Sequence, residues 1–457
     1  MKEIRTVGVI DIGKTNAKVA AVDARLLREV AVRTRPNTVL RDGPYPHYDI
    51  DGHWAFILES LKALQEEVGL DALSVTTHGA SVVLLDRAGA LAAPVLDYEH
   101  DGPDSLTGAY DAIRPDFAET GSPRLGMGLN AGAQIFWQLE QVPGLQDHVS
   151  QVLTYPQYWS FRLSGVAANE VTSLGCHTDL WDPNAGRYST LVGSLGLAGK
   201  MAPVRLAGDC LGRVTGTVAK ATGLATDTPV FCGIHDSNAS LYPHLRRREA
   251  PFSVVSTGTW VIALSIGGKP VTLDPDRDTL INVNALGNPV PSARFMGGRE
   301  FELVCGGLEG EPADADRDQV LRENIFLLPA IEQRSGPFQG RKGSWSVPED
   351  QLTPGLRKAG MSFYLALMTA ECLGMIGADG PVIIEGPFAR NGLYKAMLEA
   401  AAGRPVIAEG SSATGTSIGA AMLALADVGR AIAAPGAPAE IDPLLRNYAW
   451  NWRSAVS

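Results

Sequence analysis

The sequence predicts an α/β fold with mixed sheets flanked by helices, and three observations lead to this class. Strand-like apolar runs alternate with helix-like segments along all 457 residues. This length exceeds what a single hydrophobic core usually serves, so two or three domains are expected. An apolar strand, a polar turn with glycine and a second apolar strand occur at residues 7–24 and again at 252–266. The repeat favours a duplicated domain.

The individual elements follow from the spacing of apolar residues. One helix is predicted after Trp54, where apolar residues recur every three or four positions to Val68. Short strands are predicted where apolar and β-branched residues run together between polar breaks. These strands are residues 73–77, 82–86, 228–233 and 382–385, and the last two each precede a predicted helix. A further helix, rich in small residues, is predicted to begin in the segment 415–421.

The two strand–turn–strand units correspond position by position. Asp11 and Ser256 occupy the same place in the two units, 245 residues apart, and Gly13 and Gly258 each follow two residues later. Turns commonly contain glycine, asparagine and solvated lysine, so one reading is two ordinary hairpins that match by chance. The other reading is a pair of phosphate-binding turns that grip a polyphosphate from both sides, because glycine lets backbone N–H groups approach an anion.

Composition and charge exclude several classes of function. The chain is 45% apolar and 19% charged, as expected of a globular protein. A net charge of −11 repels polyanions, so no nucleic acid partner is expected. The five scattered cysteines form no C-x-x-C pair and fit reduced thiols in a cytoplasmic protein, not a disulfide framework or a zinc site. No apolar stretch approaches 18 residues, so no membrane partner is expected.

Four ordered segments resemble the motifs of the FGGY carbohydrate kinases, a family with two actin-like (ribonuclease H-like) domains and a cleft between them. Residues 11–15 (DIGKT) and 256–260 (STGTW) resemble the two phosphate motifs, 233–237 (GIHDS) the segment with the catalytic aspartate, and 385–391 (EGPFARN) the adenosine motif. Residues 77–81 (THGAS) are most similar to the rhamnulose and fuculose kinase branch. The resemblance implies ATP-dependent transfer of a phosphoryl group to a hydroxyl of a ketose or related polyhydroxy substrate.

The resemblance also implies a division of labour and a set of site residues. Residues 1–244 would bind the sugar and supply the catalytic base, and residues 245–457 would bind the nucleotide. Asp236 would be the base and Asp11 would hold Mg²⁺ through water. His78, Gly79 and Asp236 would contact the sugar. The nucleotide would be bound by Gly13, Lys14, Thr15, Ser256, Thr257, Gly258, Thr259, Gly386, Ala389 and Asn391.

The residues alone leave other readings open. Asp236 precedes a predicted helix and could be an N-cap, and Asp11 could form an Asx-turn. His78 could be a structural loop histidine, and the polar stretch at Glu170, Thr172 and Ser173 could form a pocket wall. The sequence also departs from the family, with Lys14 where threonine is common, Lys18 where arginine is common, and Pro387 and Phe388 in place of glycines of the adenosine loop.

Two other classes of function stay open at this point. The opening segment also resembles actin- and chaperone-like ATPases, although residues 256–260 do not form an acidic glycine-rich loop. A catalytically silent sugar sensor is the third reading. We expect the two phosphate turns to face each other across the cleft, and sugar binding to close the domains about a hinge near residues 240–251. The oligomeric state stays open, a homodimer included.

Overall fold

A computed structural model describes residues 3–409, 415–426 and 442–457, and these form two compact units. The first unit is Met1–Arg247, Ile281–Pro289 and Ala413–Ala431, and the second is Arg248–Leu280, Val290–Ser412 and Ile432–Ser457. The chain therefore leaves the first unit and returns to it twice. Among the described residues, no helix is long and apolar enough to cross a membrane.

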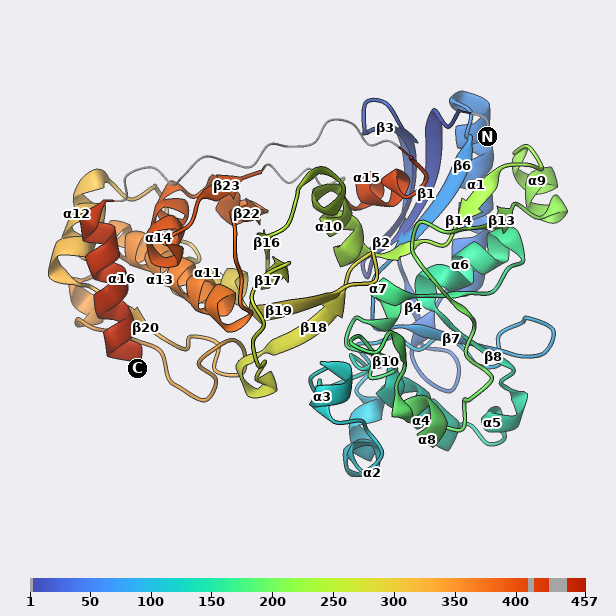
Figure 1. Ribbon diagram of the computed structural model, residues 1–457, viewed down its shortest axis with the longest axis horizontal. Coiled ribbons are helices and arrows are strands. Elements are labelled where there is room, and N and C mark those ends of the chain that lie inside the picture. Colours follow the sequence, from blue (N-terminus) through green and yellow to red (C-terminus); the bar gives the residue numbers. More distant parts are fainter. Residues whose placement is uncertain (1–2, 410–414, 427–441) are drawn as a thin grey trace. The chain divides into compact units, whose positions relative to one another are not determined.

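The first unit is organised around a mixed sheet (Figure 1). Its strand order is β13-β14-β6-β1-β2-β3, and β15 continues the line of β14 along the same edge of β6. The strands are β1 (Thr6–Ile12), β2 (Asn16–Asp23), β3 (Arg28–Pro36), β6 (Ala72–Thr77), β13 (Cys210–Arg213), β14 (Pro229–Phe231) and β15 (Ile234–His235). The predicted hairpin at residues 7–24 is confirmed as the antiparallel pair β1–β2.

Alternation along β1 determines which helices cover each face of this sheet. Ile10 and Ile12 belong to a core with helices α1 (Ile50–Glu67) and α6 (Tyr155–Ser164). Val7 and Val9 belong to a second core with α10 (Asp236–Arg247) and α15 (Gly415–Met422). Because side chains alternate along a strand, Asp11 lies on the same face as Val7 and Val9. The sheet thus directs the Asp11 carboxylate toward α10 and α15.

The small residues of α15 have a packing function. A Cβ atom placed on Gly419 would lie 1.7 Å from the Ala239 carbonyl oxygen of α10. Glycine therefore permits the close approach of the two helices. The predicted helix at this segment is confirmed, and its small side chains are explained by contact with α10.

Smaller elements complete the first unit beyond the main sheet, and many of them surround a third core. The short strands are β4 (Val39–Leu40), β5 (His47–Tyr48), β7 (Val82–Leu85), β8 (Gln151–Thr154), β9 (Asn169–Glu170), β10 (Trp181–Asp182), β11 (Arg187–Tyr188) and β12 (Val204–Arg205). The helices are η1 (Gly102–Leu106), α2 (Thr107–Asp111), α3 (Phe117–Thr120), α4 (Ala131–Gln141), α5 (Leu145–His148), α7 (Val171–Leu174), α8 (Thr190–Ser194) and α9 (Gly216–Thr222).

The second unit has its own mixed sheet, which includes the strand order β19-β17-β16-β22-β23. Its strands are β16 (Phe252–Thr257), β17 (Val261–Ile266), β19 (Pro289–Phe295), β20 (Leu327–Leu328), β21 (Ser344–Trp345), β22 (Val382–Glu385) and β23 (Val406–Ala408), and β18 (Thr279–Val283) begins in this unit and ends in the first. Its helices are η2 (Pro275–Arg277), α11 (Gly297–Cys305), α12 (Asp314–Glu323), η3 (Glu349–Gln351), α13 (Pro354–Met375), η4 (Pro387–Arg390), α14 (Gly392–Ala402) and α16 (Pro443–Val456). The largely buried α13 forms the centre of its core.

The two main sheets share one topology. In each, an antiparallel hairpin is flanked by a third antiparallel strand on one side and by two parallel strands on the other. The order β3-β2-β1-β6-β14 in the first unit corresponds to β19-β17-β16-β22-β23 in the second. The expected duplication is therefore confirmed at the level of strand order and direction.

Candidate functional site

The Asp11 carboxylate lies near the end of β1, among polar groups of the first unit. Its Oδ2 atom accepts a hydrogen bond from Ser417 Oγ on α15 at 3.2 Å and lies 3.3 Å from Lys18 Nζ. Lys18 also binds Glu29 at 3.0 Å, so the ammonium group is shared between two carboxylates. A cavity of about 440 Å³ opens beside this group, lined by Asp11, Gly13, Thr15, Asn16, Lys18 and Thr34.

The electrostatic surroundings of Asp11 suit a divalent cation. Burial raises the pKa of the Asp11 carboxyl, and Lys18 opposes this increase while the Asp236 carboxylate adds to it. A cation at this position would offset both unfavourable effects on the ionised form. Magnesium usually takes one or two protein carboxylates and keeps several waters. The Asp11 carboxylate and the hydroxyl and amide groups that line the cavity therefore fit Mg²⁺ held through water.

The Asp236 carboxylate is placed by a break between two short strands. β14 and β15 both pair with β6, and Gly233 lies between them with φ +88°. A Cβ atom at Gly233 would lie 2.6 Å from the Val75 carbonyl oxygen, so only glycine fits this turn. α10 then begins at Asp236, directly after the carboxyl end of β15. The parallel strands β1, β6 and β15 thus end beside one another and bring Asp11, His78 and Asp236 to one edge of the sheet.

Asp236 is ionised at neutral pH and remains accessible. Its Oδ1 atom lies 3.1 Å from His235 Nε2 and accepts the Ser237 backbone N–H at 2.6 Å, while about a third of the side chain (34%) stays exposed. Burial acts to raise the pKa of the Asp236 carboxyl, but His235, His78 and the Ser237 N–H together lower it below its usual value. Asp236 is the first residue of α10 and accepts the N–H of the next residue, whereas a helix cap accepts the N–H two or three residues on, so this contact is not the capping bond.

His235 is buried in a network that sequence analysis did not assign. Its backbone N–H donates to Thr172 Oγ1 at 3.1 Å, and Thr172 Oγ1 donates to Glu170 Oε2 at 2.6 Å. Its Nε2 atom lies 3.7 Å from Cys176 Sγ. Burial opposes protonation of His235, but Cys176 and Asp236 raise its pKa well above the usual value. The Nε2 atom of His235 therefore faces the Asp236 carboxylate at hydrogen-bond distance.

Glu170 holds Thr172 of this network in place by hydrogen bonds. Glu170 is fully buried and accepts the backbone N–H groups of Thr172 and Ser173 at 2.9 and 3.0 Å, so it caps α7. Burial raises the pKa of the Glu170 carboxyl to about 7, against the effect of these hydrogen bonds. Glu170 therefore positions Thr172, which in turn holds the backbone of His235.

His78 is a neutral imidazole with one unused nitrogen. Its Nδ1 lies 2.9 Å from the Gly79 carbonyl oxygen, which can only accept, so Nδ1 carries the proton and Nε2 is an acceptor. This Nε2 is buried and has no hydrogen-bond partner among the described residues. Burial lowers the pKa of His78 to about 4. The ring lies 5.1–5.2 Å from the rings of Tyr48, Tyr98 and Tyr155.

Gly79 and Lys14 complete this part of the first unit. A Cβ atom at Gly79 would lie 2.6 Å from His235 Nε2, so glycine allows His235 to approach the turn after β6. Lys14 Nζ forms ion pairs with Asp97 and, at 3.2 Å, with Glu99, and it lies 4.8 Å from the centre of the Tyr98 ring. The structure thus places Lys14 beside the segment of Asp97, Tyr98 and Glu99. Its predicted contact with a nucleotide stays a prediction.

In the second unit, the turn after β16 packs against the loop after β22. Ser256 pairs with Glu385 in the parallel ladder, and the buried Thr257 hydroxyl bonds to the Glu385 carbonyl and accepts the Phe388 N–H at 3.1 Å. Gly386 has φ +84°, and a Cβ atom there would lie 1.9 Å from the Thr257 carbonyl oxygen. These contacts join the two predicted nucleotide segments into one structure within this unit.

The remaining predicted nucleotide residues lie at or near this junction. The Gly258 N–H donates to the Trp260 carbonyl at 2.9 Å, and Thr259 is exposed at the tip of the turn. The Ala389 N–H donates to the Gly386 carbonyl at 3.1 Å. Asn391 caps α14, accepting the Tyr394 N–H at 3.0 Å and donating to Ser362 Oγ at 2.9 Å. The Asn391 and Thr257 side chains are thus engaged in contacts within this unit, whereas Thr259 is exposed.

Sequence reasoning missed the roles of His235, Cys176 and Asp97. His235 was available as the residue beside Asp236 in the same motif, which is a usable signal. The sequence held no such signal for Cys176 or Asp97. Cys176 lies 59 residues from His235 and Asp97 lies 83 residues from Lys14, so only the folded chain brings each pair together.

Comparison with known families fits this geometry. Residues 6–242 match the FGGY family of carbohydrate kinases, N-terminal domain. The chain belongs to this family. Residues 249–433 match the carbohydrate kinase FGGY, C-terminal domain.

Individual relatives agree with the family. The chain is 24% identical to an L-fuculokinase of Salmonella typhi over 269 residues, and 27% identical to a rhamnulokinase of Enterobacter sp. (strain 638) over 187 residues. These alignments cover 57% and 38% of this chain, and 56% and 38% of the relatives. The chain thus spans about half the length of the curated relatives it matches, or less.

Solved structures resemble the whole chain. A carbohydrate kinase from Novosphingobium aromaticivorans matches with a TM-score of 0.88 and 33% identity, covering 99% of both chains. A ligand-bound xylulose kinase from Lactobacillus acidophilus matches with a TM-score of 0.78 and 14% identity, covering 98% of this chain and 96% of the other. FGGY kinases have actin-like domains, so the predicted fold class is confirmed.

Proposed function

We propose that this chain is an ATP-dependent sugar kinase that transfers the γ-phosphoryl group to a hydroxyl of a ketose or related polyhydroxy substrate. The observation that carries the proposal is the gathering of Asp11, His78 and ionised Asp236 at the joined ends of β1, β6 and β15. Membership of a carbohydrate kinase family disfavours the actin- or chaperone-like ATPase, and retention of both carboxylates disfavours a silent sensor.

Asp236 is the proposed catalytic base. A sugar hydroxyl within hydrogen-bond reach of its carboxylate would be oriented toward the phosphorus and would give up its proton to Asp236 as the P–O bond forms. The nearby His235 keeps the carboxylate ionised, so it can accept that proton at neutral pH. Because phosphoryl transfer passes through a loose transition state, orientation of the hydroxyl matters more than strong basicity.

His78 and Gly79 are the proposed contacts for the rest of the sugar. The unpartnered His78 Nε2 can accept a hydrogen bond from a second sugar hydroxyl. The tyrosines around His78 offer flat apolar surfaces to the C–H faces of a sugar ring or chain. Changing Lys14 to methionine tests whether this residue contacts the nucleotide or helps to form the sugar pocket. If Lys14 helps to form the sugar pocket, the KM for the sugar rises and the KM for ATP stays within twofold.

The turns at residues 13–15 and 256–259 are the proposed phosphate contacts, with Gly386, Ala389 and Asn391 beside the adenosine. The exposed Thr15 and Thr259 hydroxyls are donors available to phosphate oxygens, whereas the Gly13 and Gly258 N–H groups donate within their own turns. Asp11 is the proposed holder of Mg²⁺ through water. When bound, the ion supplies positive charge against the phosphate oxygens.

We further propose that residues 1–244 carry the sugar site and the base, and that residues 245–457 carry the nucleotide site. The two matched family domains, 6–242 and 249–433, support this division. The cysteines of the described chain are all free thiols, which supports a cytoplasmic location. The net charge of −11 supports a small-molecule substrate over nucleic acid.

A substrate panel tests the function. Purified protein with ATP and Mg²⁺ is assayed for ADP release with ketoses, 6-deoxyketoses and polyols, and without any acceptor. We expect release to rise at least 100-fold over the acceptor-free rate with one class of sugar. ADP release that no acceptor stimulates, or no release under any condition, would contradict the proposal. Release without acceptor stimulation would support the actin- or chaperone-like ATPase, and no release would support the silent sugar sensor.

A further inference from the structure

A second cavity lies within the second unit, and three arginines line it. Its volume is about 560 Å³. Arg277 comes from η2, Arg341 from the loop between β20 and β21, and Arg453 from α16. The other lining residues are Asp276, Pro337, Phe338, Gln339, Glu371, Val456 and Ser457. Three cations around one cavity are unexpected in a chain with a net charge of −11.

Contacts within the protein hold the three arginines in place but do not occupy all of their N–H donors. Arg277 Nε donates to the Pro337 carbonyl at 3.0 Å, and Arg341 donates to the Val456 carbonyl. Arg453 Nε donates to Glu371 Oε1 at 2.8 Å, and its Nη2 donates to the Ala401 carbonyl at 3.1 Å. A guanidinium group has five N–H donors. Each arginine therefore keeps at least one terminal nitrogen without an acceptor among the described residues.

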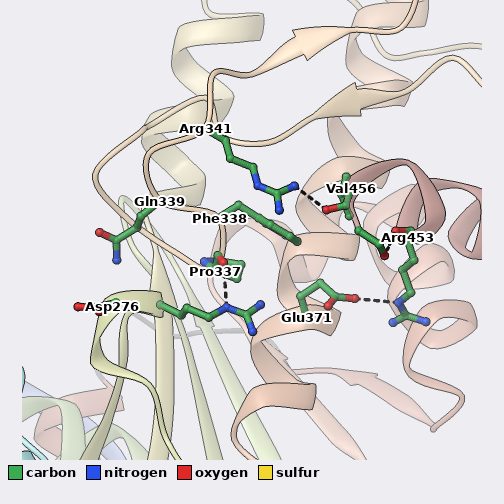
Figure 2. A pocket seen from close by; sticks show the side chains of 10 residues that line it. Asp276, Pro337, Phe338, Gln339, Arg341, Glu371, Arg453 and Val456 are labelled. Carbon is green, nitrogen blue, oxygen red and sulfur yellow. Dashed lines mark hydrogen bonds and ion pairs between the residues drawn. The ribbon is translucent and has the colours of Figure 1, made fainter.

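Asp276 and Glu371 also line the cavity, but two of its three arginines have no carboxylate partner at ion-pair distance among the described residues. Figure 2 shows Glu371 directed at Arg453, whereas the Asp276 and Gln339 side chains are directed away from Arg341 and Arg453. Glu371 thus neutralises Arg453, and Arg277 and Arg341 face the cavity without a carboxylate partner. Uncompensated guanidinium groups around a cavity favour an anion, and their planar forks match carboxylate and phosphate oxygens.

The cavity wall is built from ordered contacts. The Gly336 N–H donates to Asp278 Oδ2 at 2.8 Å, which ties the loop before Pro337 and Phe338 to the segment of Arg277. Phe338 is buried, and the Arg341 guanidinium lies 5.1 Å from its ring centre (Figure 2). A site whose side chains are fixed before binding loses less conformational entropy when a ligand arrives.

We propose that this cavity binds a small multivalent oxyanion, a phosphate ester or a polycarboxylate, at a site separate from the residues proposed for catalysis. Arg277 and Arg341 supply the principal contacts, with Arg453 held at the rim by Glu371. The volume exceeds that of a single inorganic phosphate and lies within the range of small-molecule sites. The proposal does not depend on which sugar the protein phosphorylates.

Calorimetric titration of the full chain tests this site. Inorganic pyrophosphate and citrate are the two probes, each titrated without Mg²⁺ in the presence of saturating ADP, so that a nucleotide site is filled. We expect one anion per chain, with Kd near 1 mM or below. Binding of pyrophosphate alone would identify the phosphate-ester class, binding of citrate alone the polycarboxylate class, and binding of both a general oxyanion site.

Matched variants locate the binding. Arg277→Ala and Arg341→Ala should each weaken binding at least tenfold, while Arg334→Ala, a change at a 94% exposed arginine of the same loop, should leave it within twofold. Because Arg341 is exposed, Arg341→Ala should leave the fold intact, and thermal unfolding of both variants checks that they are folded. No binding in the presence of ADP, or binding that neither variant weakens, would overturn the proposal whatever the substrate panel gives.

Discussion

Replacing Asp236 with asparagine separates a catalytic carboxylate from a structural one. Asparagine keeps an oxygen that can accept the Ser237 N–H, which Asp236 accepts at 2.6 Å, so the local contact at the start of α10 is preserved. It loses the negative charge beside His235 and cannot take a proton. Because a third of the Asp236 side chain is exposed, we expect a change of about 1 kcal/mol or less in the free energy of unfolding.

The effect on catalysis should be much larger. Loss of a general base typically costs about 10² to 10⁴ in rate, or about 3 to 5.5 kcal/mol of transition-state stabilisation. We therefore expect kcat to fall by at least 100-fold at saturating sugar, with the Kd for ADP within twofold. The control is Asp86→Asn, which changes a turn aspartate that accepts two backbone N–H groups at 2.8 and 2.9 Å. A variant at Asp236 that keeps more than a tenth of kcat would refute the assignment of the base.

Two further predictions concern the turn of the second unit and the aromatic cluster of the first. Gly386→Ala should weaken ADP binding at least tenfold, because its Cβ would lie 1.9 Å from the Thr257 carbonyl oxygen. The control, Gly392→Ala, has open space around its Cβ and should leave the Kd for ADP unchanged. Equal Kd values for the two variants would show that the turn at Gly386 has no part in ADP binding. Burial lowers the pKa of His78 from 6.5 to about 4, so the unfolded chain binds more protons in this window and stability is lost as pH falls from 6.5 toward 4, by about 3 kcal/mol. Chemical denaturation at several pH values should show this loss reduced in His78→Gln but not abolished, since burial lowers the pKa of His53 similarly; an unchanged slope would mean that His78 does not titrate as its burial requires.

Local features of the fold could be predicted from the sequence, whereas the partners of the site residues could not. Alternation and glycine turns predicted both hairpins, and the strand at 382–385 has the predicted bounds. These features depend on neighbours in the chain. Lys14 was open to a phosphate role because nothing near it in the sequence indicated Asp97 as its partner. Pairings across 59 or 83 residues depend on the path of the whole chain, which periodicity does not record.

The return of α15 to the first unit affects how the protein can fold during synthesis. Ala420, Ala421 and Met422 are fully buried in the core that also holds Val7 and Val9, and Ser417 contacts Asp11 across 406 residues of sequence. Domains generally fold as units as the chain emerges from the ribosome, the amino-terminal one first. Here the first unit cannot complete one face of its sheet until nearly the whole chain has been made. A nascent chain stopped before residue 415 would expose that apolar face, which makes it a natural binding surface for a chaperone.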